Sequence, residues 1–208
     1  MNKPTCPTLP EATAAMRRRL SKDEINALPL ERWQGPIQLV NSPQQCREVL
    51  PRLSSSSLLG FDTETRPAFR KGQSYPPSLL QLATAEEVFL FQLKKTGLPQ
   101  ELSALLSDHT VAKVGVAIAD DLENLQKIES FQHGGFTDIA RISKRLGLHH
   151  HGLRGLAAAV LDFRISKSAR TSNWANDQLS QAQLQYAATD AWVGREIFIR
   201  LSELQAAA

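Results

Sequence analysis

Two acidic side chains in the first third of the chain have a spacing that suits metal binding. Asp62 and Glu64 end the apolar run Leu58–Phe61, which predicts a buried strand. Residues two positions apart on a strand project from the same face, so the two carboxylates should lie side by side. They would repel each other unless a cation lay between them, and Mg²⁺ favours such oxygen ligands. The alternative is an acidic turn in solvent, which a lone Asp-x-Glu pattern also fits.

A second pair of polar side chains lies near the end of the chain, on a predicted helix. Apolar residues recur at helical spacing from Leu179 to about Leu204, and Ser180 with Gln183 resembles an N-terminal capping box. Tyr186 and Asp190 are then one turn apart on one face of the helix. The phenol and the carboxylate could share a water molecule or a metal ion. A half-buried tyrosine beside an unrelated aspartate is the alternative.

A third candidate lies between these pairs, where a strand is followed by a helix. Val111–Val116 is typical of a strand, and Ala119–Ile128 is typical of a helix. An aspartate at a helix start usually caps the free N–H groups, but two adjacent aspartates leave one for another role. We expect Asp120 to be the cap and Asp121 to be the acid that faces inward.

The order and spacing of these motifs resemble those of a known enzyme family. In the tyrosine-type branch of the DnaQ-like 3′-5′ exonucleases, three motifs supply Asp and Glu, then Asp, then Tyr-x-x-x-Asp. The similarity covers about Pro36 to Leu204 and is greatest to the ribonuclease D and Werner-syndrome-helicase exonuclease group. The similar stretches are Gly60–Glu64, Ser78–Leu82, Val114–Asp121, Lys167–Trp174 and Tyr186–Ala191. The choice of Asp121 over Asp120 rests on this comparison.

The resemblance implies both a fold and a mechanism. The fold would be α/β and ribonuclease-H-like, with a mixed sheet covered by helices, as strands that pair first and later alternate with helices also indicate. Two Mg²⁺ or Mn²⁺ ions about 4 Å apart would activate water and stabilise the leaving 3′ oxygen. Asp62 would bridge both ions, Glu64 and Asp190 would help to hold one, and Asp121 would position the other. Tyr186 would orient the attacking water.

Basic residues near the motifs indicate a nucleic-acid partner. The net charge is +3, and Arg66, Lys167 and Arg170 flank the acidic motifs, where they could grip phosphates without reading sequence. We expect a strand with a free 3′ end, with DNA favoured over RNA, because ribonuclease D proteins carry further helical domains beyond this point. The alternatives are ribonuclease-D-like RNA processing, an inactive binding module and a proofreading subunit. The sequence indicates no protein partner.

The remaining sequence predicts one exonuclease domain, residues 34–208, after a polar tail, residues 1–33, with a short helix near Glu11–Leu20. No apolar run approaches the roughly 20 residues that span a membrane, and no secretion signal begins the chain, so we expect a cytoplasmic protein. Two isolated cysteines, Cys6 and Cys46, are expected to be reduced thiols. A proline-rich loop and a hairpin turning at Ala85-Glu86 are also predicted.

Overall fold

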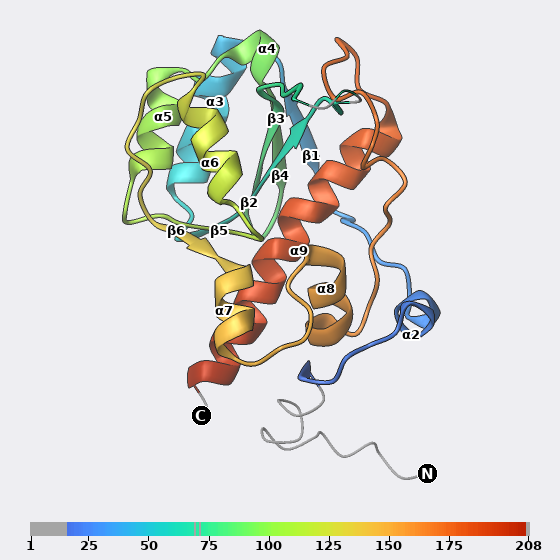
Figure 1. The fold of residues 1–208 in the computed structure, drawn as a ribbon. Helices are drawn as coiled ribbons and strands as arrows, with labels where there is room; N and C mark the ends of the chain where they lie inside the picture. Colours follow the sequence, from blue (N-terminus) through green and yellow to red (C-terminus); the bar gives the residue numbers. More distant parts are fainter. Residues whose placement is uncertain (1–15, 69, 71, 207–208) are drawn as a thin grey trace.

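A six-stranded mixed sheet is the centre of the computed structural model, which describes residues 16–68, 70 and 72–206 (Figure 1). In sheet order the strands are β1 (Ile37–Val40), β4 (Val88–Gln92), β3 (Pro77–Ala83), β2 (Leu58–Thr65), β5 (Ala112–Gly115) and β6 (Phe136–Asp138). Strand β3 is antiparallel to both of its neighbours, β2 and β4, and the other pairs are parallel. This is the mixed sheet expected from the sequence.

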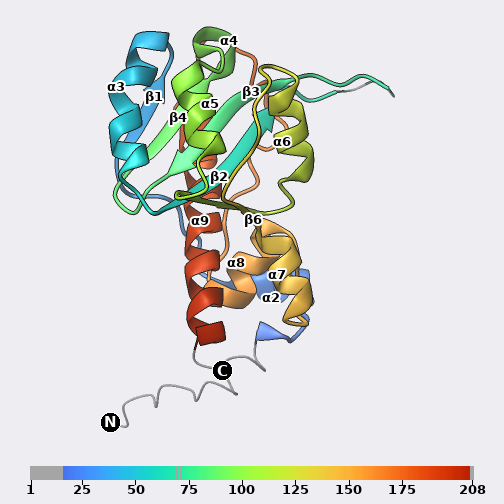
Figure 2. The same ribbon diagram turned by 90° about the vertical axis from the view of Figure 1, so that its left-hand side faces the viewer.

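Helices cover both faces of the sheet. They are α2 (Lys22–Ala27), α3 (Pro43–Ser54), α4 (Leu93–Thr96), α5 (Gln100–Ser107), α6 (Ala119–Gln126), α7 (Ile139–Arg145), α8 (Leu153–Leu161) and α9 (Gln181–Ala206). Figure 2 shows α3, α5 and α6 on one side of the sheet, and α9 on the other. Helix α9 contacts strands β1 to β5, and α7 and α8 pack against it. The fold thus places one long helix across the whole sheet.

The alternation of apolar side chains along the central strands explains this arrangement. Leu80 and Leu82 of β3 join the core cluster that contains α3 and α5, whereas Leu79 and Ala83 join the cluster that contains α9. Neighbouring side chains on a strand point to opposite faces, so a strand that is apolar throughout needs cover on both sides. The apolar run Leu79–Ala83, broken by Gln81 alone, therefore requires helices on both faces.

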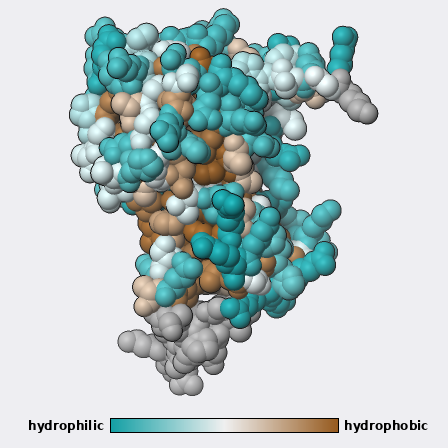
Figure 3. Space-filling model, turned by 60° about the vertical axis from the view of Figure 1, so that its left-hand side comes forward, coloured by the Kyte–Doolittle hydropathy of each residue, from teal (hydrophilic) through white to brown (hydrophobic). Residues whose placement is uncertain are grey.

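The surface outside this core is largely hydrophilic. Figure 3 shows hydrophilic side chains over much of one face, with hydrophobic ones gathered around its middle. Among the described residues, Leu30 is the large hydrophobic side chain that remains exposed, at 53%. Within the same part of the chain, no helix has the length and the apolar character needed to cross a bilayer.

Helix α9 approaches β2 most closely at Gly60. A Cβ atom built on Gly60 would lie 2.0 Å from the Ala191 carbonyl oxygen. Backbone atoms cannot move aside as the end of a flexible side chain can, so any larger residue at this position would push the helix away. Gly60 thereby sets the distance between β2 and α9.

The segment before β1 packs on the folded domain from Met16 onward. Met16 and Trp33 are buried, and Leu30 forms an isolated β-bridge with Arg164. Helix α2, capped by Ser21, lies within residues that we expected to form a polar tail. The boundary at residues 33 and 34 stays a prediction. The first half of the helix expected at Glu11–Leu20, like Cys6, lies outside the described residues, and the residues from Arg17 to Leu20 are not helical.

Most elements expected from the sequence are present. The hairpin between β3 and β4 closes through a hydrogen bond from Thr84 N to Glu87 O of 2.9 Å. Elements α4 and β6 were not expected, and both are short. A segment of three or four residues has too little periodicity to be recognised in sequence, because its structure depends on the strands that it joins.

We predict that Gly60→Ala lowers the free energy of unfolding by about 2–3 kcal/mol, because the added methyl group collides with the α9 backbone. Urea denaturation followed by circular dichroism measures this change. Gly194→Ala, within α9, is the matched control: its Cβ would make ordinary contacts of 3.7 Å or longer. That variant should gain about 0.5–1 kcal/mol from helix propensity. Equal stabilities for the two variants would show that the close approach is not a constraint.

Candidate active site

Strand β2 carries Asp62 and Glu64 toward helix α9. Both side chains lie on the same face as Gly60, which α9 covers, because the three positions differ by two and four residues. Their carboxylate oxygens and one from Asp190 all lie within 4.8 Å of one another. The structure therefore brings the two neighbouring acids of β2 together with Asp190, which lies far from them in sequence.

Helix α9 positions Asp190 from the other side. The helix begins with the reciprocal contacts expected of a capping box: Gln183 N donates to Ser180 Oγ at 3.3 Å, and Ser180 N donates to Gln183 Oε1 at 3.0 Å. Asp190 is 7% exposed, and its Oδ1 atom has no hydrogen-bond partner in the described residues. A buried carboxylate oxygen without a partner is costly, which suggests that another group completes this site.

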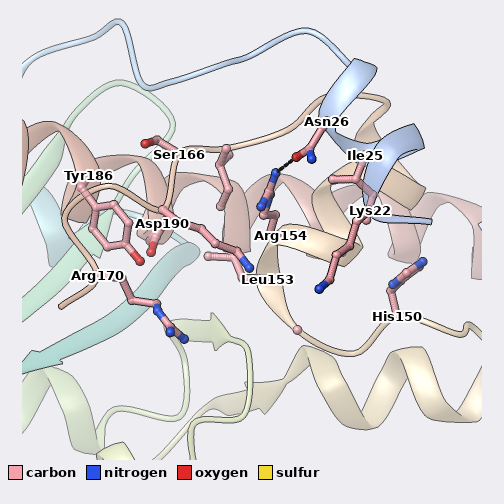
Figure 4. A pocket seen from close by; sticks show the side chains of 14 residues that line it. Lys22, Ile25, Asn26, His150, Leu153, Arg154, Ser166, Arg170, Tyr186 and Asp190 are labelled. Carbon is pink, nitrogen blue, oxygen red and sulfur yellow. Dashed lines mark hydrogen bonds between the residues drawn. The ribbon is translucent and has the colours of Figure 1, made fainter. Parts of the chain in front are cut away.

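Tyr186 stands one turn before Asp190 on α9. Its ring packs on buried Trp174, with the ring centroids 5.9 Å apart, and its hydroxyl faces Asp190 (Figure 4). The expected i, i+4 relation is therefore confirmed. Trp174 is buried and serves as packing for the tyrosine.

Asp121 reaches the site from helix α6. The cap prediction for Asp120 is wrong: Ile118 is the N-cap residue, no side chain caps the helix, and Asp120 is exposed. Local propensity favoured a capping aspartate, but α6 begins two residues too early for Asp120 to adopt that position. Asp121 faces inward and accepts a hydrogen bond from the Thr63 hydroxyl. It thus lies beside β2, next to the three clustered acids.

Burial and mutual repulsion shape the acidity of the β2 carboxylates. Loss of solvent raises the pKa of Asp62 well above its usual value, and the charges of Asp190 and Asp121 raise it further. The Thr63 backbone N–H, which donates to Asp62 Oδ1 at 3.0 Å, opposes this shift. The same causes raise the pKa of Glu64 to about 9, against a smaller effect of the Arg170 charge. Both shifts favour the protonated forms, and a bound cation would oppose them.

The groups on the helices follow the same pattern. Burial raises the pKa of Asp190 to about 7, and a hydrogen bond from Tyr186 partly opposes the shift. Burial also raises the pKa of Asp121, although its bond from Thr63 lowers it. The pKa of Tyr186 rises above its normal range because of burial and the nearby negative charges of Asp190 and Glu64. The tyrosine hydroxyl therefore remains a hydrogen-bond donor at neutral pH.

The chemistry of this donor set fits a hard divalent cation. All three clustered side chains offer oxygen, and their repulsion would be relieved by positive charge. Mg²⁺ and Mn²⁺ prefer such oxygen ligands, whereas Zn²⁺ favours nitrogen and sulfur. The unpartnered Oδ1 of Asp190 is consistent with the same occupant.

Gln81 is a neighbour of this cluster to which the sequence analysis gave no role. It pairs directly with Asp62 across strands β2 and β3, so the two side chains share the face under α9. Gln81 is fully buried, and neither its Oε1 nor its Nε2 has a partner in the described residues. The signal for it was present in the sequence, since it is the one amide in the apolar run Leu79–Ala83.

A cavity of about 520 Å³ opens beside Tyr186 and Asp190. Lys167 and Arg170, which we expected to bind nucleic acid, line it together with them, and Figure 4 shows Arg170 near Asp190. Arg66 lies elsewhere: it stacks over Tyr75, 4.8 Å from the ring centroid, and lines a separate cavity of about 340 Å³. The structure thus joins two of the three expected basic residues to the acids, and the role of Arg66 stays a prediction.

Comparisons with known proteins agree with this geometry. Residues 37–205 match the model of a family described as 3′-5′ exonuclease. The mouse bifunctional 3′-5′ exonuclease/ATP-dependent helicase WRN is 31% identical over 98% of this chain, which spans only 15% of that protein. The Nibbler EXO domain of Aedes aegypti has a similar fold, with a TM-score of 0.77 and 22% identity over 85% of this chain and 93% of that one.

A further solved structure, ribonuclease D of Trypanosoma brucei in complex with RNA U12, gives a TM-score of 0.73. The two proteins are 18% identical, and the matched region covers 91% of this chain and 66% of the ribonuclease D chain. At this low identity the likeness concerns the fold. These folds are of the DnaQ-like exonuclease type that the sequence predicted. The family match spans every strand of the sheet and every clustered acid, and on that ground the chain belongs to the 3′-5′ exonuclease family.

Proposed function

We propose that this domain removes nucleotides one at a time from the 3′ end of a nucleic acid, with DNA favoured over RNA, by metal-dependent hydrolysis. The observation that carries the proposal is the approach of Asp62, Glu64 and Asp190 within 4.8 Å beneath α9. In the reaction, water adds to the terminal phosphorus and the bond to the 3′ oxygen breaks. The products are a nucleoside 5′-monophosphate and a strand with a new 3′ hydroxyl.

The four acids are suited to hold Mg²⁺ or Mn²⁺. Asp62 is our candidate for a bridging ligand because the family resemblance assigns it that role, and it lies in the cluster with Glu64 and Asp190. Glu64 and Asp190 would complete one side, and Asp121 the other. When bound, a pair of such ions lowers the pKa of water and stabilises the charge on the leaving oxygen.

Tyr186 would act as a donor and not as a base. Its raised pKa keeps the hydroxyl protonated, so it is able to donate a hydrogen bond to water or to a phosphate oxygen. Packing on Trp174 fixes the direction of that hydroxyl. Lys167 and Arg170 are exposed at the same cavity, where their charges would attract the phosphates of the strand.

The preference for DNA rests on the likeness to the Werner-type group, which includes the segment Lys167–Trp174. RNA is the alternative, because a protein of the same fold has been solved with RNA bound. Discrimination between them depends on contacts with the 2′ position of the sugar. A direct comparison of both substrates is therefore part of the first experiment.

We predict that the protein shortens 5′-labelled strands from the 3′ end with Mg²⁺ or Mn²⁺, and that Asp62→Asn reduces the rate by about a thousandfold or more. Loss of the central carboxylate removes the charge that would bridge the ions. A gel time course with DNA and RNA of the same sequence, with EDTA as the blank, measures both the activity and the preferred sugar.

Two neighbouring aspartates of α6, Asp120 and Asp121, provide a matched comparison for that experiment. Asp121→Asn should be strongly impaired, and Asp120→Asn, which changes an exposed carboxylate, should behave as wild type. Normal activity of Asp62→Asn would refute the site, and impairment of Asp120→Asn alone would reassign the second motif. Faster shortening of RNA would overturn the DNA preference.

We predict that Tyr186→Phe lowers kcat about ten- to a hundredfold with little change in KM, because a hydroxyl that only orients water contributes mainly in the transition state. Steady-state kinetics on a labelled single strand provides both constants. Phe keeps the contact with Trp174, so thermal unfolding should confirm an intact fold. An unaltered kcat would remove the hydroxyl from the mechanism.

We predict that the metal-free protein loses stability as pH rises from about 5 to about 9. The folded-state pKa of Glu64 is about 9, above its usual value of 4.5, so the folded state binds this proton more tightly than the unfolded state does. The stability that this proton contributes is lost as the pH rises through that range. Glu64→Gln abolishes the titration and should melt about 4 °C or more above wild type near pH 9 in EDTA. Differential scanning fluorimetry measures both proteins.

Added Mn²⁺ should raise the melting temperature of the wild type near pH 8, and should do so less for Glu64→Gln, because binding to the folded state adds stability. Glu123→Gln, which alters an exposed carboxylate on α6, is the control and should respond as wild type does. An equal metal response in all three proteins would exclude Glu64 as a ligand.

A further inference from the structure

The cavity beside Tyr186 and Asp190 extends well beyond the acidic cluster. In Figure 4 it runs from these two residues, past Arg154, to Lys22 and His150. Its far wall is formed by α2 and by the first turn of α8. Its volume of about 520 Å³ is within the range of about 300–1,000 Å³ typical of ligand sites. The acids therefore occupy only one end of a longer depression.

The charges around this depression have one sign, apart from the acid at its end. Four cations line it: Lys22, Arg154, Lys167 and Arg170. Among the described residues of the lining, Asp190 is the one that is acidic. A concave wall with charges of one sign concentrates its field and attracts ions of opposite charge. A polyanion entering along this path would meet cations until it reached the acidic cluster.

Arg154 links the two elements of the far wall. It donates from Nη2 to Asn26 Oδ1 of α2 at 2.6 Å, drawn as a dashed line in Figure 4. Its Nε is buried and has no partner among the described residues. An arginine presents its donors as a planar fork that suits phosphate oxygens. Arg154 therefore anchors α2 and also brings a positive charge to the cavity lining.

The remainder of the lining favours a backbone over a particular base. Apart from Tyr186 and His150 it contains no aromatic ring, and its other members are aliphatic or small polar residues. Hydrogen bonds and stacking to bases specify sequence, whereas cations contact phosphates of any sequence. The far part of the depression thus suits the sugar-phosphate backbone.

We propose that α2 and the first turn of α8 form a second phosphate-binding region, centred on Lys22 and Arg154, which holds the substrate strand on the 5′ side of the bond that is cut. This inference rests on the proposed exonuclease function. Helix α2 precedes residues 37–205, the part that matches the family model, so the preceding segment supplies half of this region. Strands too short to reach from Asp190 to α2 gain nothing from it.

The test is the binding of 5′-fluorescein-labelled oligothymidylates of about two to about twelve nucleotides, followed by anisotropy in EDTA, where no cleavage occurs. Lys22→Glu should weaken binding of the longest strand about tenfold or more, and should lower the slope of log affinity against log salt by about one. The loss should be smaller for the dinucleotide. Lys22 is exposed, so this variant should fold normally.

A second variant and a control complete the design. Arg154→Gln keeps a donor for Asn26 and removes the charge, and it should weaken long strands as Lys22→Glu does. Lys144→Glu makes the same change of charge on α7, outside the cavity lining, and should bind as wild type. Equal losses in Lys144→Glu and Lys22→Glu would reveal only an effect of net charge and overturn the proposal.

Hydrolysis by the wild type with Mn²⁺ is measured in parallel, which separates this inference from the proposed function. If the wild type binds strands in the expected length-dependent way and cleaves none, the exonuclease proposal fails while the binding region stands. If the wild type cleaves strands but Lys22→Glu and Arg154→Gln bind them as tightly as wild type does, the proposed binding region is refuted and the exonuclease proposal is not. Absence of any binding by the wild type contradicts the binding region as well.

Discussion

The contact between Gly60 and the Ala191 carbonyl determines how close α9 lies to β2, and the whole site depends on that distance. Asp62 and Glu64 follow Gly60 on the same strand face, and Asp190 precedes Ala191 on the helix. A displacement of the helix by even the size of a methyl group would separate the carboxylates that now lie within 4.8 Å. A glycine without any chemistry of its own is thus the reason why three acids can cooperate.

The close approach of the three carboxylates has an electrostatic cost, and the stability of the surrounding core offsets it. Burial disfavours ionisation of all three carboxylates, repulsion by neighbouring acids adds to this for Asp62 and Glu64, and the upward shifts in their pKa values express these causes. The fold tolerates it because apolar contacts hold α9 against strands β1 to β5 and against α7 and α8. The same negative charges, together with burial, raise the pKa of Tyr186, so its hydroxyl stays protonated. One arrangement of charges therefore produces both a cation site and a neutral donor beside it.

The sequence predicted those parts of the fold that have strong local or repeated signals. The strand into Asp62, the hairpin at Ala85-Glu86 and the long helix through Asp190 each combine an apolar period with turn or capping residues. The prediction that Asp120 caps α6 was wrong because capping depends on the residue at which the helix begins, and the neighbouring strands determine that residue. The cavity at Lys22 depends on contacts distant in sequence, and no local pattern encodes these.

The N-terminal segment illustrates why polar composition alone is a weak guide to function. Lys22 and Asn26 are ordinary surface residues in sequence, yet Arg154 draws their helix against α8, where it becomes a wall of the cavity that leads to Asp190. A neutral wall would leave the buried acids repelling a phosphate strand at every step of its approach. Cations placed along the path compensate for that repulsion before the strand arrives. An acidic catalytic centre that acts on a polyanion thus requires a basic surround, and here segments far apart in sequence supply it together.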